Sequence, residues 1–210
     1  MGVATGRDLA RFLRRHHQGV LAFGGRVAPA RYVVEGRSEG APALIVGLEP
    51  VALSAPEHLL FVPEERADAA QVLLVPIRAP STGDRGTDRW EGYFGPPSKL
   101  ALCRAVVRGV KWRGEVYEGE TLDLSNPLLP VQGRLLRELN ADPRGLIGLC
   151  ARAGGTAARP VAVGMDPDGL DIRAEVVGVV RVEFPEPAPN EAEAEARVRA
   201  LRTGAGGSAA

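Results

Sequence analysis

Residues 161–187 read VAVGMDPDGLDIRAEVVGVVRVEFPEP, and this stretch decides the fold of the last third of the chain. Apolar residues on both sides of the DPDG sequence predict two strands joined by a tight turn, because Asp and Gly favour turn conformations. A second pairing follows and ends at the Phe-Pro-Glu-Pro sequence, since proline cannot donate a hydrogen bond to a strand ladder. The stretch indicates how this part folds and, by itself, indicates no reaction.

Helices are predicted on both sides of this stretch. Val131–Leu139 places its leucines on one helical stripe. Asp142-Pro143 suits the N-cap and first position of a second helix, which runs to Ala153. Asn190 caps a last helix, Glu191–Arg202, with acids in its first turns and arginines in its last, as the helix dipole favours.

The first 124 residues have a different pattern. They contain one predicted helix, Arg7–His17, and about six short strands. Two stretches rich in glycine and proline, Pro80–Arg89 and Gly92–Ser98, are predicted loops. Short strands with frequent turns favour an antiparallel sandwich or barrel over a parallel sheet.

The composition changes at residues 125–130 (SNPLLP), where we place the domain boundary. We expect an α+β protein with one β-rich domain at 1–127 and a small αββα domain at 131–203. The Gly/Ala/Ser tail at 204–210 is predicted to be disordered.

Composition and charge limit the functions to consider. Apolar residues make up 45% of the chain and charged residues 25%, as in soluble globular proteins, and the formal net charge is zero. A neutral chain has no overall attraction to nucleic acid or to an anionic membrane. No apolar run approaches the roughly 20 residues that cross a bilayer, and the N-terminus lacks the apolar core of a signal peptide. We therefore expect a cytoplasmic protein with neither nucleic-acid nor membrane partners.

The C-terminal part resembles a known domain of unknown function, which follows the split barrel in haem-utilisation proteins and in related plant and bacterial proteins. The shared residues are Gly164–Arg173 (GMDPDGLDIR) and Arg181–Pro187 (RVEFPEP). They combine a turn, an Asp-Gly-apolar-Asp-apolar-Arg strand and an Arg-x-x-Phe-Pro-x-Pro exit before a final helix. The resemblance covers about residues 131–202.

The same family usually opens this domain with His-Met-Asn-x-Asp-His. The corresponding residues here are Glu138–Pro143 (ELNADP), so Asn140 and Asp142 are kept and both histidines are replaced. A metal or haem contact through those two histidines is therefore not expected in this chain.

The first 124 residues resemble the FMN-binding split barrel of the pyridoxamine-phosphate-oxidase type. The resemblance rests on a helix before the first strand, on Ala30–Val34 (ARYVV) and on Arg104–Gly109 (RAVVRG). It implies an antiparallel split β-barrel, a homodimer, and a cofactor between the subunits, with FMN as the expected cofactor and haem as the alternative. The family's run of Thr, Arg or Lys, and Asn around the flavin phosphate is not found in Pro50–Glu65.

A flavin phosphate requires two or three cationic or N–H donors that converge on it. Arg31, Lys99 and Arg104 are the candidates, because each is predicted at the end or start of a strand; the alternative is that they are solvated surface cations. Trp112 is the candidate aromatic wall for an isoalloxazine or porphyrin ring, with Tyr93 nearby in sequence and a core position for Trp112 as the alternative.

Other chemistry-bearing residues are few. The histidines, from which a haem ligand of that type would have to come, are His16, His17 and His58. Packed or capping roles are the alternative for them. The only cysteines, Cys103 and Cys150, exclude a CxxC site, and a core position is predicted for Cys103.

Three aspartates of the sequence DPDGLD (166–171) suggest calcium at first sight. They are Asp166, Asp168 and Asp171. An EF-hand loop carries a Glu at its twelfth position, and counting from Asp166 that position is Val177. The spacing instead suits a turn that joins two strands, and we expect no metal site.

Two functions follow. In the first, the protein is oxidoreductase-like and binds FMN, or alternatively haem, between subunits, and the cofactor supplies the redox chemistry. In the second, it is a cofactor-free, degenerate split barrel that acts as a binding or regulatory protein. No catalytic triad, glycine-rich phosphate loop or paired-carboxylate motif is present, so the residues name no catalytic group and no substrate.

Overall fold

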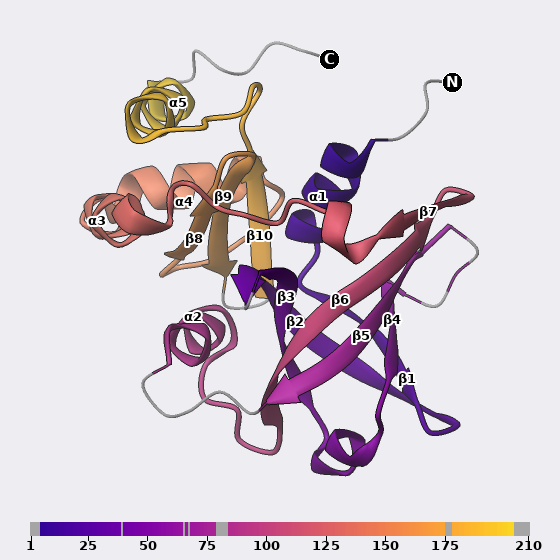
Figure 1. The fold of residues 1–210 in the computed structure, drawn as a ribbon. Coiled ribbons are helices and arrows are strands. Elements are labelled where there is room, and N and C mark those ends of the chain that lie inside the picture. The colour runs from indigo at the N-terminus through magenta and orange to yellow at the C-terminus, as the bar shows by residue number, and fades with distance from the viewer. Residues whose placement is uncertain are drawn as a thin grey trace. The chain divides into compact units, whose positions relative to one another are not determined.

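The structure, a computed structural model, describes residues 5–203 except residues 39, 65, 67, 79–83 and 175–177. The chain divides into two compact units, Met1–Ser125 and Asn126–Ala210. The first contains a six-stranded antiparallel barrel, and the second contains a three-stranded sheet with helices (Figure 1). The predicted α+β fold class is confirmed.

The barrel is made of six antiparallel strands. They are β1 (Gln18–Phe23), β2 (Arg26–Ser38), β3 (Ala41–Leu48), β4 (His58–Val62), β5 (Ala70–Arg78) and β6 (Ala101–Trp112). The order is β3-β2-β1-β4-β5-β6, and β6 also pairs with β3, which closes the barrel. A short strand, β7 (Glu115–Glu118), forms a hairpin with β6. Pro76 lies beyond Leu74, the last residue of β5 that pairs with β4. At this position β4 requires no hydrogen bond from a backbone N–H of β5, which proline lacks.

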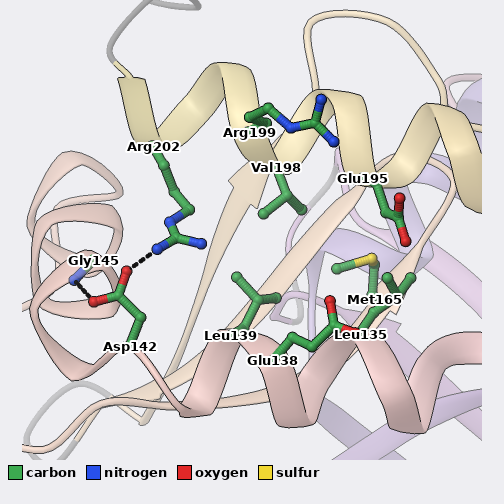
Figure 2. Close-up of a pocket in the computed structure, with 10 residues that line it drawn as sticks. All are labelled: Leu135, Glu138, Leu139, Asp142, Gly145, Met165, Glu195, Val198, Arg199 and Arg202. Carbon is green, nitrogen blue, oxygen red and sulfur yellow. Dashed lines mark hydrogen bonds and ion pairs between the residues drawn. The ribbon is translucent and has the colours of Figure 1, made fainter.

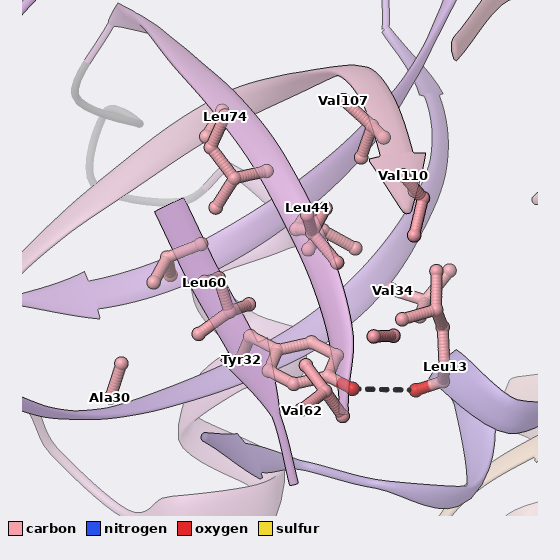
Figure 3. Packing of buried hydrophobic residues seen from close by; sticks show 14 of the residues in the cluster. Leu13, Ala30, Tyr32, Val34, Leu44, Leu60, Val62, Leu74, Val107 and Val110 are labelled. Carbon is pink, nitrogen blue, oxygen red and sulfur yellow. Dashed lines mark hydrogen bonds between the residues drawn. The ribbon is translucent and has the colours of Figure 1, made fainter. Parts of the chain in front are cut away.

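The interior of the barrel is filled by the apolar side chains that alternate along each strand (Figure 3). Buried members of this core include Tyr32, Val34, Leu44, Val46, Leu60, Val62, Leu74, Cys103, Ala105 and Val107. Side chains at the intervening positions of β2, β3 and β6 lie on the outer face of the barrel. Because of this alternation, only predicted site residues on the same face of the barrel can contact one another.

Helix α1 (Gly6–Arg15) packs its apolar face against the barrel core. Thr5 and Asp8 form a capping box at its N-terminus, which satisfies donors that the first turn leaves unpaired. Leu9 and Leu13 are fully buried, and the Tyr32 hydroxyl donates a hydrogen bond to the Leu13 carbonyl at 2.9 Å. This bond is drawn in Figure 3.

Helix α2 (Arg85–Phe94) stands where the sequence predicted loops; residues 80–83 of that stretch lie outside the described residues. Asp84 caps the helix by accepting from the Gly86 N–H at 2.8 Å. A Cβ at Gly47 of β3 would lie 2.8 Å from the Trp90 ring, so this glycine allows α2 to pack closely on the strand. The loop prediction is confirmed for residues 95–98 and was wrong for residues 85–89 and 92–94. Glycines lower helix propensity there, whereas burial of Trp90 and Tyr93 stabilises the helix through distant contacts.

Among its described residues, the second unit has three helices and one sheet. Its elements are α3 (Leu129–Asn140), α4 (Pro143–Arg152), β8 (Val161–Asp166), β9 (Gly169–Ala174), β10 (Gly178–Glu183) and α5 (Glu191–Thr203). The sheet order is β10-β9-β8, with antiparallel pairs. The predicted turn between Asp166 and Gly169 is confirmed. The predicted second pairing is made by a third strand, β10, so the sheet has three strands and the predicted αββα order named only two. None of the helices in the described part of the chain has the length and apolar character that a membrane span requires.

Replacing Tyr32 with Phe should lower the free energy of unfolding by about 1 kcal/mol, because the buried Leu13 carbonyl loses its donor while the ring still packs. Replacing Tyr32 with Ala also removes the ring and should cost about 3–5 kcal/mol. Urea denaturation followed by tryptophan fluorescence measures both. An unchanged midpoint for Tyr32→Phe would show that this bond contributes nothing to stability.

Candidate functional site

The residues predicted to hold a cofactor do not form one site. Arg31 on β2 and Arg104 on β6 both lie on the outer face of the barrel. Trp112, which is 3% exposed, belongs to the barrel core and contacts Phe12 of α1 with ring centroids 5.0 Å apart. Lys99 is exposed in the turn that precedes β6. The barrel wall therefore separates the predicted aromatic wall from the two arginines.

Arg104 is held by two carboxylates. Its Nε donates to Glu35 Oε2 at 2.7 Å, and its Nη2 donates to Glu35 Oε1 at 2.5 Å and to Asp84 Oδ1 at 2.8 Å. The Arg104 side chain is only 6% exposed. The hydrogen bonds with Glu35 raise the pKa of Arg104 above its ordinary value, although burial opposes them. One cation between two anions leaves a net negative charge, which does not attract a phosphate.

The Arg104 cluster has a structural role. Asp84 accepts both from Arg104 and from the Gly86 N–H, so the same carboxylate caps α2 and binds the barrel wall. Glu35 contributes the third element, strand β2. The cluster thus joins β2, β6 and the N-terminus of α2.

A second group of side chains gathers at the C-terminal end of α2. The guanidinium carbon of Arg31 lies 5.5 Å from the centre of the Phe94 ring. Phe94 contacts Trp90 and Tyr93, with ring centroids 4.9 and 6.0 Å apart. Tyr93 also contacts the ring of His17 at 4.9 Å. An exposed cation, aromatic rings and a half-buried histidine therefore lie in one chain of contacts, which we call the α2 aromatic cluster.

The other two histidines are packed elsewhere. His58 is buried and its Nε2 lies 2.8 Å from the Ala52 carbonyl oxygen. His16 contacts Phe12, with ring centroids 4.6 Å apart, and burial lowers its pKa. Both cysteines are buried, and burial raises the pKa of Cys103 to about 11, so that thiol is a poor nucleophile at neutral pH.

The aspartates of the DPDG turn pair with an arginine. Arg181 donates from Nη2 to Asp166 Oδ1 at 2.5 Å and from Nη1 to Asp171 Oδ1 at 2.8 Å, and its side chain is 4% exposed. Asp166 Oδ1 also accepts from the Asp168 N–H at 2.8 Å, which stabilises the turn. Arg181 lies opposite Asp171 in the register of β10 and β9, so the pairing of these two strands brings the two side chains together. Within the described ranges, no group of three or more His, Cys, Asp or Glu side chains is arranged to hold a metal ion.

A cavity of about 570 Å³ lies in the second unit between α3 and α5 (Figure 2). Its apolar lining comes from Leu135, Leu139, Met165 and Val198. Its charged lining comes from Glu138, Asp142, Glu195, Arg199 and Arg202. The cavity therefore combines an apolar middle with charged groups, as small-molecule sites commonly do.

Ion pairs connect α5 to neighbouring elements on both sides of this cavity, to α3 on one side and to the N-cap of α4 on the other. Arg134 of α3 pairs with Glu195 of α5 at 2.6 Å and also with Glu191. On the other side, Arg202 of α5 pairs with Asp142, which caps α4 by accepting from the Gly145 N–H at 3.0 Å. Figure 2 shows Glu195 and Arg202 at opposite ends of the lining.

This cavity was not predicted from the sequence. The leucines of α3 were expected to form a core stripe, and the charges of α5 were explained by the helix dipole. The lining residues follow the spacing i, i+3, i+4, i+7 in both segments, from Leu135 on α3 to Asp142 just beyond that helix and from Glu195 to Arg202 on α5. This repeated mixture of apolar and charged residues on one helical face was the signal in the sequence that could have predicted the cavity.

The fold and the register define the class of the first unit, a split β-barrel. The chain is similar to the protein Atu2129, of unknown function, from Agrobacterium tumefaciens str. C58, with a TM-score of 0.64 and 17% identity over 92% of this chain and 93% of that one. It is also similar to a haem-binding protein from Mycobacterium smegmatis, with a TM-score of 0.40 and 22% identity over 99% and 100% of the two chains. No family model and no curated protein matches the sequence. At 17% identity, the similarity to Atu2129 shows the fold alone.

Replacing Arg104 with Met should lower the free energy of unfolding by about 2–4 kcal/mol, because Glu35 and Asp84 would face each other without a cation. Arg31→Met is the matched control, and we expect a change within about 0.5 kcal/mol for this exposed residue. Chemical denaturation measures both. Equal stability of the two variants would contradict a structural role for Arg104.

Proposed function

We propose that the protein is a small-molecule-binding protein whose ligand occupies the cavity between α3 and α5. The cavity itself carries this proposal. Its volume of about 570 Å³ lies within the usual range for small-molecule sites. Its apolar middle would bury the body of a ligand, and the charged side chains at both ends would fix its orientation.

The barrel supports a binding role more than a flavin-dependent one. Arg104, the most deeply placed of the three candidate cations, is neutralised by Glu35 and Asp84. Trp112 packs inside the barrel and is not available to a ring on the outer face. We therefore favour a cofactor-free split barrel that acts as a binding or regulatory protein.

A second candidate function is cofactor binding at the α2 aromatic cluster. Arg31 and Lys99 are exposed cations, and either could meet the phosphate of FMN. Haem would instead use His17 as a ligand, with Tyr93 and Phe94 as aromatic neighbours. In a homodimer of the kind that the split-barrel resemblance implies, such a cofactor would be shared between subunits.

Replacing Val198 with Trp should fill the cavity and weaken binding of an apolar fluorescent probe, anilinonaphthalene sulfonate, by about tenfold or more. Ala196→Trp is the matched control, since Ala196 lies on α5, is exposed and is not part of the lining. Fluorescence titration measures the affinity, and circular dichroism checks that both variants fold. Equal binding by the two variants, or no saturable binding by the parent protein, would contradict the proposed site.

An absorbance titration with FMN and then with haemin separates the two candidate functions. We expect neither cofactor to remain bound after gel filtration, because the predicted phosphate donors and ring wall do not converge. A retained flavin band that Arg31→Ala abolishes would favour an FMN protein. A shifted Soret band that His17→Ala abolishes would favour a haem protein.

A further inference from the structure

Helix α5 forms one side of the cavity. Its contribution to the lining includes Glu195, Val198 and Arg202, and the remaining lining comes from α3, from the start of α4 and from Met165 on β8. Figure 2 shows Val198 of α5 and Leu139 of α3 pointing toward each other across the cavity. Displacement of α5 alone would therefore open the cavity.

The chain is fixed to the turn of the sheet shortly before α5. The Phe184 N–H donates to the Asp168 carbonyl at 2.9 Å, and the Ala188 N–H donates to the Pro167 carbonyl at 2.7 Å. Phe184 and Ala188 are both buried. Since α5 begins at Glu191, a movement of the helix would pivot between Ala188 and this residue.

Side chains attach α5 to the rest of the second unit. A helix that moves as a body keeps its own backbone hydrogen bonds, so opening breaks side-chain contacts. The apolar contact is made by Ala194, which is buried, and by Val198 and Leu201, which are partly buried. Alanine buries little apolar surface, so ion pairs contribute a larger share here than in a helix packed by large side chains. One of these pairs joins Arg202 to Asp142, the N-cap of α4.

The other attachment is centred on Arg134 of α3. Its Nη2 pairs with Glu195 at 2.6 Å and also with Glu191, both on α5, while its Nη1 pairs with Glu138 on its own helix. Hydrogen bonds with these carboxylates raise the pKa of Arg134 above its ordinary value. The Arg134 side chain is 40% exposed, so dissolved salt screens these pairs.

We propose that α5 is a lid on the cavity, that Arg134 holds the lid against α3, and that release of Arg134 admits the ligand. Opening requires that the ion pairs of Arg134 with Glu191 and Glu195 break, and each such exposed pair is weak. The role in ligand entry rests on the proposed function. The movement of α5 itself can be measured without any ligand.

Oxidation of Met165 measures this movement. Met165 is 1% exposed, so a bulky oxidant such as tert-butyl hydroperoxide reaches its sulfur only when the cavity opens. Mass spectrometry of the peptide that contains Met165 gives the initial rate. Raising the salt concentration from about 20 to about 500 mM should accelerate oxidation about threefold or more, because screening weakens the ion pairs. Arg134→Gln should produce a similar acceleration at low salt and a smaller response to added salt.

Arg66→Gln is the matched control, because Arg66 forms an exposed ion pair with Asp68 in the first unit. This control should leave the oxidation rate and its salt response unchanged, and free methionine corrects for any effect of salt on the oxidant. Chemical denaturation gives the oxidation rate that global unfolding alone would allow. A rate that does not exceed this value, or that neither salt nor Arg134→Gln changes, would overturn the lid.

Binding kinetics then test ligand entry. The dye N-phenyl-1-naphthylamine is uncharged, so salt acts on the protein and has little effect on the dye. In stopped-flow fluorescence, the observed binding rate should level off at high dye concentration at the rate of lid opening, and Arg134→Gln should raise this limit about threefold or more.

Saturable binding with a rate that rises linearly with dye concentration and is equal in Arg134→Gln would overturn the lid and leave the proposed binding function standing. Accelerated oxidation of Met165 without saturable dye binding would instead contradict the proposed function and the role of α5 in ligand entry, although the movement of α5 would be established.

Discussion

The antiparallel pairing of β6 with β3 is the interaction on which the rest of the first unit depends. It closes the barrel and leaves neither strand with an open edge along the paired length. Its register places Arg104 opposite Ile45 on the outer face and Cys103 opposite Val46 in the interior. A shift of one residue would exchange the two faces, so the closure also decides which β6 side chains meet solvent, α2 or the core.

The two units share a structural device, a buried arginine between two carboxylates. Arg104 joins two strands and a helix start, and Arg181 joins β10 to β9 and to the turn before it. Removing ions from water is costly, and a buried pair is weak evidence for stability, but breaking one is strongly destabilising. In both units, residues that suggested a phosphate or calcium site from the sequence belong to such clusters.

Local patterns predicted much of the fold, because their causes are local. Helix stripes and caps located the C-terminal helices, and the DPDG turn located the sheet. Helix α2 was missed because its stability comes from packing of Trp90 against β3, far away in the sequence. The role of Arg104 was hidden for the same reason: Glu35 is 69 residues away and Asp84 is 20 residues away, and only the folded register brings them together.

The cavity follows from the composition of α5. Ala194 is fully buried, whereas Val198 and Leu201 are only partly buried against the core of the second unit. Small and scattered apolar residues cannot fill the space over α3, so ion pairs at each end of the cavity connect α5 to the unit. Exposed ion pairs each contribute little and weaken as salt increases. Helix α5 is therefore attached partly through ion pairs that salt weakens, and a ligand that filled the cavity beside it would stabilise α5.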